Sequence, residues 1–155
     1  MKGLIIFAPN ECALDDLADR IRREAWPQPS MHSINGRHTP QFRIGQGWLG
    51  EAVLSRLEHE KIVTTKEDVC WATVLPPGAK YAPHNHTGHA TVAVWCLVGS
   101  GALHLEPDVV VPDRAGQLVV FAGRRLHWVP QVEHERITVA VNLGWTPSDR
   151  RTEKW

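Results

Sequence analysis

The sequence predicts a mainly β fold: a sandwich or barrel of short strands, preceded by one or two helices. From residue 67 onward, short apolar runs alternate with glycine and proline, which is typical of strands joined by turns. This spacing favours a sandwich or barrel over a sheet built from strand–helix–strand units. The eight expected strands cover residues 68–75, 80–84, 91–98, 102–106, 109–111, 117–121, 126–129 and 136–143.

The residues before this region are expected to form a cover of one strand and two helices. The apolar run at residues 3–8 predicts the strand, and Asn10 is the expected N-cap of a helix that ends at Pro27. This helix has one apolar stripe, because apolar residues recur at helical spacing at Leu14, Leu17, Ala18, Ile21 and Ala25.

Residues 28–47 are polar and contain prolines and several glycines, so we expect a long loop that could hold one strand at residues 41–44. Loops of this kind often form the wall or lid of a site. A second short helix is expected over residues 51–60. Its inward side chains are expected to be Val53, Leu54 and Leu57.

Length and charge narrow the class of protein. The 155 residues suit a single domain, with the cover in 1–66 and the β core in 67–145, and the polar tail from Thr146 is expected to fray. Seventeen basic and 17 acidic residues cancel, so we expect neither nucleic acid nor a membrane as partner. The apolar run at 4–9 is too short for a signal peptide or a membrane span. Three widely spaced cysteines argue against a disulfide framework and for a reducing, cytoplasmic location.

Three histidines form the candidate functional site. His84 and His86 are separated by one residue at the end of an expected strand, so both side chains point to one face, roughly 6.6 Å apart along the chain. His127 follows another apolar strand in a similar frame. An isolated H-x-H pair is more often two polar residues that face water, but the third histidine favours a mononuclear metal site inside a barrel. Three protein ligands leave open positions, as in catalytic sites, and imidazole suits iron, zinc, copper and nickel alike.

Other polar and aromatic residues have less defined roles. His89 could lie behind the ligands or on the surface, and His104 could line the interior of the barrel or face solvent. Trp71, Trp95 and Trp128 could wall a pocket or pack in the core. No role is assigned to His32, His38, His59 and His134.

Arg136 opens the last expected strand, nine residues after His127. If that strand pairs with the strand that carries His127, the guanidinium points into the barrel behind the metal. A buried arginine there needs an anionic partner, and a bidentate carboxylate is the natural one. The alternative is a solvent-exposed arginine paired with Glu133 or Glu135.

The pattern around the histidines resembles the double-stranded β-helix, or jelly roll, of cupins and 2-oxoglutarate/Fe(II) oxygenases. In the cupin pattern five residues separate a glycine from the H-x-H pair, as they separate Gly78 from His84 here, and another glycine precedes the last histidine, as Gly116 does. The glutamate of that pattern is missing, because Ala90 and Thr91 occupy its place. A three-histidine site is what remains.

Residues 71–143 resemble more closely a branch of 2-oxoglutarate/Fe(II) oxygenases that carries H-x-H where most relatives carry H-x-D. That branch also has a glycine-led apolar strand ending in phenylalanine, then a turn and His-x-Val, and it closes with an Arg-Ile-Ser-type strand ending in asparagine. The corresponding residues here are His84-Asn85-His86, Gly116 to Phe121, His127-Trp128-Val129, and Arg136-Ile137-Thr138 through Asn142.

The resemblance implies an oxygenase that hydroxylates a small-molecule substrate. It implies that His84, His86 and His127 hold Fe(II), or another divalent metal, and that Arg136 binds the distal carboxylate of 2-oxoglutarate. The further side chains expected in the pocket or directly behind the ligands are His89, His104, Trp95 and Asn142.

Two other functions stay open. Three neutral imidazoles leave the full charge on Fe(II), which favours a three-histidine cupin dioxygenase, of the thiol or diketone type, whose own substrate chelates the metal. The third reading is a non-catalytic cupin module that binds a metal or a small ligand. Cupin-like sheets with exposed edges often pair, so a homodimer is a further expectation.

Overall fold

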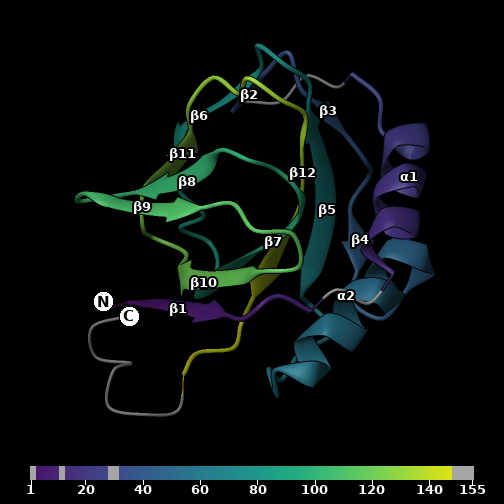
Figure 1. Cartoon of the computed structure of the whole chain (residues 1–155). Helices are drawn as coiled ribbons and strands as arrows, with labels where there is room; N and C mark the ends of the chain where they lie inside the picture. Colours follow the sequence, from purple (N-terminus) through teal and green to yellow (C-terminus); the bar gives the residue numbers. More distant parts are fainter. Residues whose placement is uncertain (1–2, 11–12, 28–31, 148–155) are drawn as a thin grey trace.

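Two antiparallel sheets face each other and roll into a barrel, with two helices packed outside one of them (Figure 1). The computed structural model describes residues 3–10, 13–27 and 32–147. The helices are α1 (Leu14–Glu24) and α2 (Gly47–His59). A mainly β fold with two helices near the N-terminus is therefore confirmed.

The larger sheet has seven strands in the order β1-β10-β7-β12-β5-β3, with β4 also paired to β5. Its strands are β1 (Leu4–Phe7), β3 (Arg37–His38), β4 (Phe42–Arg43), β5 (Val69–Leu75), β7 (Thr91–Val98), β10 (Leu118–Ala122) and β12 (Arg136–Leu143). The smaller sheet has five strands in the order β2-β6-β11-β8-β9. Its strands are β2 (Ser33–Ile34), β6 (Lys80–His84), β8 (Ala102–Leu105), β9 (Val109–Pro112) and β11 (His127–Val129).

From β5 onward the chain passes repeatedly from one sheet to the other, and only β8 and β9 follow each other within one sheet. This alternation is the winding of a jelly roll, so the predicted double-stranded β-helix is confirmed. All eight strands expected after residue 67 are present, each end within one residue of its predicted place. The apolar runs and their turn residues were sufficient to locate them.

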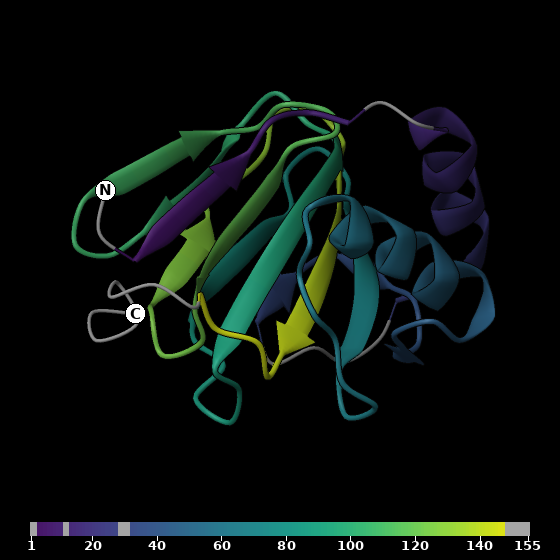
Figure 2. The same cartoon turned by 90° about the horizontal axis from the view of Figure 1, so that it is seen from below.

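The core has two parts, one on each face of the larger sheet. One cluster joins that sheet to the helices, which lie together on its outer side in both views (Figures 1 and 2). The other cluster fills the space between the two sheets. Strand β12 shows how one sequence serves both, because alternate residues point to opposite faces. Ile137, Val139 and Val141 pack toward the helices, whereas Arg136 and Thr138 line the interior.

The predicted stripe of α1 is buried at Leu14, Ala18 and Ile21, but the predicted N-cap is wrong. The helix starts at Leu14 after Ala13, which has a left-handed backbone (φ 55°) and no side-chain cap. The backbone N–H of Asn10 donates instead to the carbonyl of Gly116, so Asn10 belongs to the edge of the barrel.

Helix α2 starts at Gly47, four residues before the predicted position. Glycine has a poor intrinsic helix propensity, so the Gly47-Trp48-Leu49-Gly50 segment gave no helical signal. Gly50 is required by packing, because a Cβ at this position would lie 2.2 Å from the carbonyl oxygen of Arg43. Of the three side chains expected to face inward, Val53 and Leu57 are buried and Leu54 is half-buried.

The expected loop at 28–47 contains three two-residue strands in its described part, which starts at residue 32. Strand β4 falls inside the predicted 41–44, whereas β2 and β3 were not predicted. Strand β2 pairs with β6, and β3 and β4 pair with β5, so the segment borders both sheets. None of the described helices is long and apolar enough to cross a bilayer.

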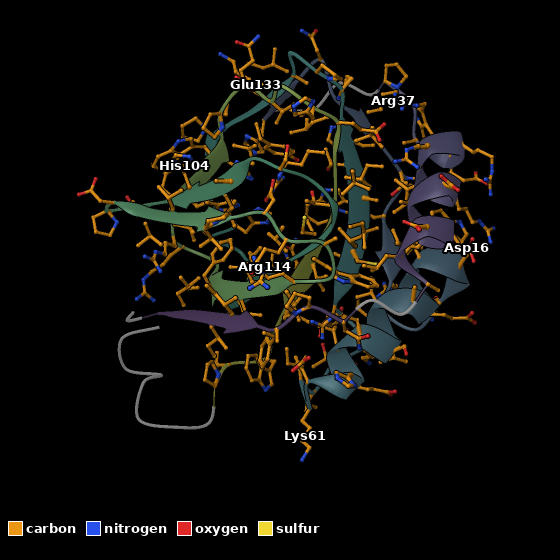
Figure 3. The ribbon with its side chains drawn as sticks, viewed as in Figure 1. Asp16, Arg37, Lys61, His104, Arg114 and Glu133 are labelled. Atoms are coloured by element: carbon orange, nitrogen blue, oxygen red, sulfur yellow. The ribbon has the colours of Figure 1, made fainter. Side chains whose placement is uncertain are left out.

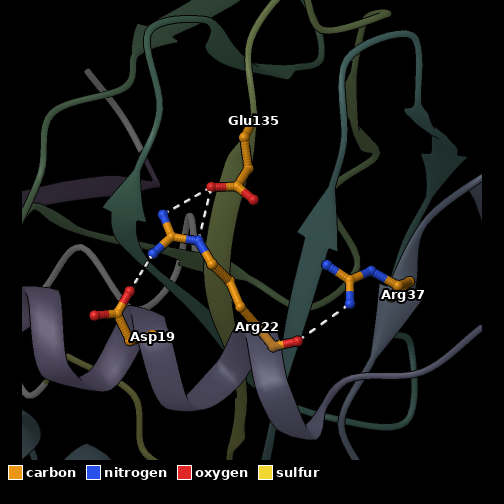
Figure 4. A network of polar contacts seen from close by, with 4 residues as sticks. All are labelled: Asp19, Arg22, Arg37 and Glu135. Atoms are coloured by element: carbon orange, nitrogen blue, oxygen red, sulfur yellow. Dashed lines mark hydrogen bonds and ion pairs between the residues drawn. The ribbon is translucent and has the colours of Figure 1, made fainter.

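A polar network fastens α1 to the start of β12 (Figure 4). The Nε and Nη2 atoms of Arg22 donate to Glu135 Oε1 at 2.9 and 2.7 Å, and the carbonyl of Arg22 accepts from Arg37 Nη1 at 3.1 Å. The bond to Glu135 raises the pKa of Arg22. Glu135 immediately precedes Arg136, so the network holds the chain where β12 begins.

The helix-facing core predicts a stability effect that can be separated from the interior of the barrel. Leu57 is fully buried between α2 and the larger sheet. Replacing it with alanine should lower the free energy of unfolding by about 2–5 kcal/mol, through lost burial and a residual cavity. The control is Val63→Ala at a 69 % exposed position, where the change should stay within about 0.5 kcal/mol. Chemical denaturation measures both, and equal effects would contradict the assigned core.

Candidate metal centre

The three histidines that the sequence analysis grouped meet at one point of the smaller sheet. His84, at the end of β6, and His127, at the start of β11, are directly paired in the strand register. His86 lies two residues beyond β6. One ligand nitrogen from each residue lies within 4.8 Å of the others, and the ring centroids are 4.2 to 5.2 Å apart.

Each of the three rings is held by a hydrogen bond at its Nδ1 atom. His84 Nδ1 lies 2.7 Å from the Ala82 carbonyl oxygen, and His127 Nδ1 lies 2.9 Å from that of Arg125. His86 Nδ1 lies 2.8 Å from Asn142 Oδ1. These oxygens only accept, so each Nδ1 carries the hydrogen and each Nε2 of a neutral ring keeps its lone pair.

Burial keeps the rings neutral. Desolvation lowers the pKa of His84 to about 4 and that of His127 to about 3, and it also lowers the pKa of His86. Neutral imidazoles with a lone pair on Nε2 are the form that binds metals. His86 Nε2 is buried and has no hydrogen-bond partner among the described residues, which a native site rarely tolerates. The donor set therefore fits a divalent transition metal.

Aromatic rings enclose the cluster. Trp71 of β5 stacks on His86 with ring centroids 5.9 Å apart, and Phe121 forms a T-shaped pair with His127, with ring centroids 4.8 Å apart. His32 stacks on His84 at 4.4 Å with an interplanar angle of 12°. Sequence reasoning missed His32, because it lies in a polar segment without periodicity and reaches the site only through the pairing of β2 with β6.

Arg136 reaches the interior from the opposite sheet. The premise that its strand pairs with the strand of His127 was wrong, because β12 pairs with β5 and β7. Arg136 nonetheless lines the cavity that contains the three histidines, and its side chain is buried. Its partner is Asp113, with Nε–Oδ2 at 2.8 Å and Nη2–Oδ1 at 3.1 Å. A bidentate carboxylate was expected, but not this one, and Glu135 is bound to Arg22 instead.

The remaining candidate residues lie in different surroundings. Asn142 contacts His86 directly, as described above. His89 is exposed and lies outside the three-histidine group. His104 points out of the barrel, because Leu103 and Leu105 beside it fill the interior (Figure 3 labels His104 over the smaller sheet).

The three tryptophans also separate. The ring of Trp128 packs beside that of His104, with ring centroids 5.6 Å apart, on the side of the smaller sheet that faces away from the cavity. Trp71 lines the cavity. Trp95 does not: it lies in the helix-facing core cluster, while its neighbour Val94 lines the cavity on the other face of β7. The expectation that Trp95 belongs to the pocket is corrected by this one-residue difference in strand position.

Comparisons with known proteins identify the fold. No family model and no curated protein matches the sequence. Among solved structures, a prolyl-4-hydroxylase from Pseudomonas putida is similar with a TM-score of 0.72 at 20% identity, over 95% of both chains. A prolyl hydroxylase from Trichoplax adhaerens has a TM-score of 0.66 at 15% identity, over 92% of this chain and 84% of that one. An oxidoreductase of the 2OG-Fe(II) oxygenase family from Burkholderia pseudomallei has a TM-score of 0.67 at 14% identity, over 96% and 88%. At these identities the likeness shows a shared double-stranded β-helix.

The hydrogen bond from His86 to Asn142 predicts a loss of metal affinity on substitution. Asn142→Leu removes the acceptor that orients the ring, so metal affinity should fall by about 10- to 100-fold. Asn142→Asp keeps an acceptor and should retain binding. Thr138→Val, four residues away on the same strand face, is the control. Calorimetric titration with Fe(II) under nitrogen measures all three, and undiminished affinity in Asn142→Leu would contradict the assigned role.

The buried neutral histidines also predict acid sensitivity of the metal-free protein. His127 has a pKa of about 3 when folded against an ordinary value of 6.5, so between these values the unfolded chain binds more protons. The contribution of neutral His127 to the free energy of unfolding should therefore be fully present above pH 6.5. It should fall as the pH drops toward 4, by up to about 1.4 kcal/mol per pH unit.

Replacing His127 with asparagine should make that pH dependence shallower, whereas His134→Asn, at an exposed position, should leave it unchanged. Urea denaturation at a series of pH values measures the slopes. Equal slopes in the wild type and His127→Asn would show that burial of His127 does not depress its proton affinity.

Proposed function

We propose that this protein is a non-haem Fe(II)-dependent oxygenase that uses 2-oxoglutarate to hydroxylate a small-molecule substrate. The observation that carries the proposal is the cluster of three neutral histidines, each with Nδ1 hydrogen-bonded to an acceptor so that Nε2 keeps its lone pair. The fold agrees with it, because solved structures that share it include prolyl hydroxylases and a member of the 2OG-Fe(II) oxygenase family.

His84, His86 and His127 would hold the iron. Three protein ligands leave further positions on the metal for other groups, as catalytic sites require. When bound, iron with 2-oxoglutarate and O2 would supply the oxidising chemistry, and the protein would supply binding, orientation and exclusion of water.

Arg136 would anchor the distal carboxylate of 2-oxoglutarate. It lines the same cavity as the histidines, and the bonds to Asp113 use only two of its five N–H groups. The hydroxyl-bearing residues Thr73, Tyr81 and Thr138 line the same cavity and could add hydrogen bonds.

The apolar part of the cavity would keep water away from the reacting groups. Val92, Val94, Leu103 and Val129 line it, and all four are buried. A low-polarity wall strengthens every electrostatic interaction inside the site and limits side reactions with solvent.

One observation favours a second function, a three-histidine dioxygenase of the thiol or diketone type that needs no 2-oxoglutarate. Asp113 already provides Arg136 with a carboxylate partner, so the guanidinium end of the cavity has no unpaired positive charge for a second anion. In this alternative the substrate itself would chelate the iron.

The two functions differ in one spectroscopic test. Under the proposed function, adding 2-oxoglutarate to the anaerobic Fe(II) protein should produce a visible metal-to-ligand charge-transfer band. Arg136→Ala should abolish this band at moderate 2-oxoglutarate concentration and leave iron binding intact. Arg114→Ala, at an exposed arginine next to Asp113, is the matched control and should keep the band.

A protein that binds iron but shows no band, with or without Arg136, would contradict the use of 2-oxoglutarate and favour the second function. Failure of the wild-type protein to bind iron at all would contradict both oxygenases. It would leave a small-ligand-binding module as the remaining expectation.

We also propose a cytoplasmic location and a homodimer. Cys70 and Cys96 are free thiols and buried, and burial raises the pKa of each to about 12, which makes them unreactive. Free thiols of this kind suit a reducing compartment. Strand β9 forms an edge of the smaller sheet, and Val110 on it is 53 % exposed, which suits pairing with a second copy. Light scattering after size-exclusion chromatography measures the oligomeric state.

A further inference from the structure

The carboxylate of Asp113 occupies a site built to hold it against Arg136. Both side chains are nearly inaccessible, at 3 % exposure for Asp113 and 4 % for Arg136. The backbone N–H of Asp113 donates to the Gly101 carbonyl at 2.9 Å. Gly99 leaves room for the carboxylate, because a Cβ there would lie 2.7 Å from Asp113 Oδ2. The segment between β7 and β8 is thus shaped around Asp113.

The geometry of the pair leaves part of the guanidinium for another ligand. Asp113 takes one hydrogen from Nε and one from Nη2. The remaining donors of a guanidinium are both hydrogens on Nη1 and the second on Nη2, which form another fork suited to a carboxylate. Arg136 therefore keeps its hydrogen-bonding capacity toward the cavity while its charge is already paired.

The pair also sets the charge at the end of the cavity where Arg136 lies. Among the described residues that line it, Arg136 is the only one with a permanent charge, since the three histidines are neutral by burial. Asp113 cancels that charge at hydrogen-bond distance. A dicarboxylate whose distal end reaches Arg136 would meet hydrogen-bond donors but little net positive charge at that end.

We propose that Asp113 is a specificity-determining residue: by neutralising Arg136, it lowers the affinity of the site for 2-oxo acids that carry a distal carboxylate. The inference rests on the proposed function, since it takes Arg136 as the anchor for that carboxylate. It predicts that affinity is limited by the charge of Asp113 and that 2-oxo acids without a distal carboxylate do not sense this charge.

Calorimetric titration of the anaerobic Fe(II) protein tests this with two probes, 2-oxoglutarate and 2-oxopentanoate, which share the chelating end and differ at the distal end. Asp113→Asn removes the charge and keeps the size. It should tighten the binding of 2-oxoglutarate on the order of tenfold, as expected for removal of a nearby charge in a partly shielded site. Binding of 2-oxopentanoate should stay within about twofold, since it has no charge at that end. Asp108→Asn, at an exposed aspartate between β8 and β9, is the matched control and should change neither.

A second variant separates charge from shape. Asp113→Ser also removes the charge but cannot span the guanidinium, so a shared gain for 2-oxoglutarate in both variants isolates the charge. Circular dichroism and thermal melts establish that each variant is folded. If neither folds, the wild type still decides. We then expect the wild-type affinities for the two probes to differ by less than about tenfold, and this difference to change little with salt concentration.

Weaker 2-oxoglutarate binding in both variants would overturn the proposal, because Asp113 would then serve to orient Arg136. In the wild type, a strong preference for 2-oxoglutarate that salt abolishes would overturn it as well. Failure of the proposed function has a different signature: the wild type would bind no 2-oxoglutarate. If the Asp113 variants then bind it, the inference holds while the native protein does not use 2-oxoglutarate, and if they do not, the inference falls too.

Discussion

The pairing of β11 with β6 is the constraint on which the candidate site depends. It sets His127 opposite His84 in the register, and the H-x-H spacing adds His86 from the chain that leaves β6. A shift of one residue in this register would turn His127 out of the barrel and break the cluster. Because the rest of the jelly roll surrounds this pair, the fold and the site are specified by the same hydrogen bonds.

The larger sheet completes the site from the opposite side. Strand β12 presents Asn142 to His86 and Arg136 to the same cavity from one face, while its other face packs against the helices. The acceptors for His84 and His127 are backbone carbonyls, whereas His86 depends on a side chain from the other sheet. Docking of the two sheets therefore affects the orientation of one ligand directly.

Much of the fold could be predicted from the sequence because its signals are local. The strands from β5 to β12 are short apolar runs bounded by glycine or proline, and the grouping of the three histidines needed only the alternation of side chains along a strand. The features that were missed depend on distant contacts. The start of α2 was hidden by Gly47 and Gly50, which packing against Phe42 and Arg43 requires, and β2 and β3 exist only because β6 and β5 pair with them. Asp113 follows a short strand without any local mark, so its contact with Arg136 could come only from the structure.

The central claim is that the three Nε2 atoms bind one metal ion. Anomalous X-ray diffraction from crystals grown anaerobically with Fe(II), collected on both sides of the iron absorption edge, tests it most directly. The account predicts one strong peak within about 2.0–2.3 Å of Nε2 of His84, His86 and His127, as expected for first-row metals bound by imidazole. A peak bound through Nδ1 or lying away from this cluster, or no peak in a crystal that contains iron, would contradict it.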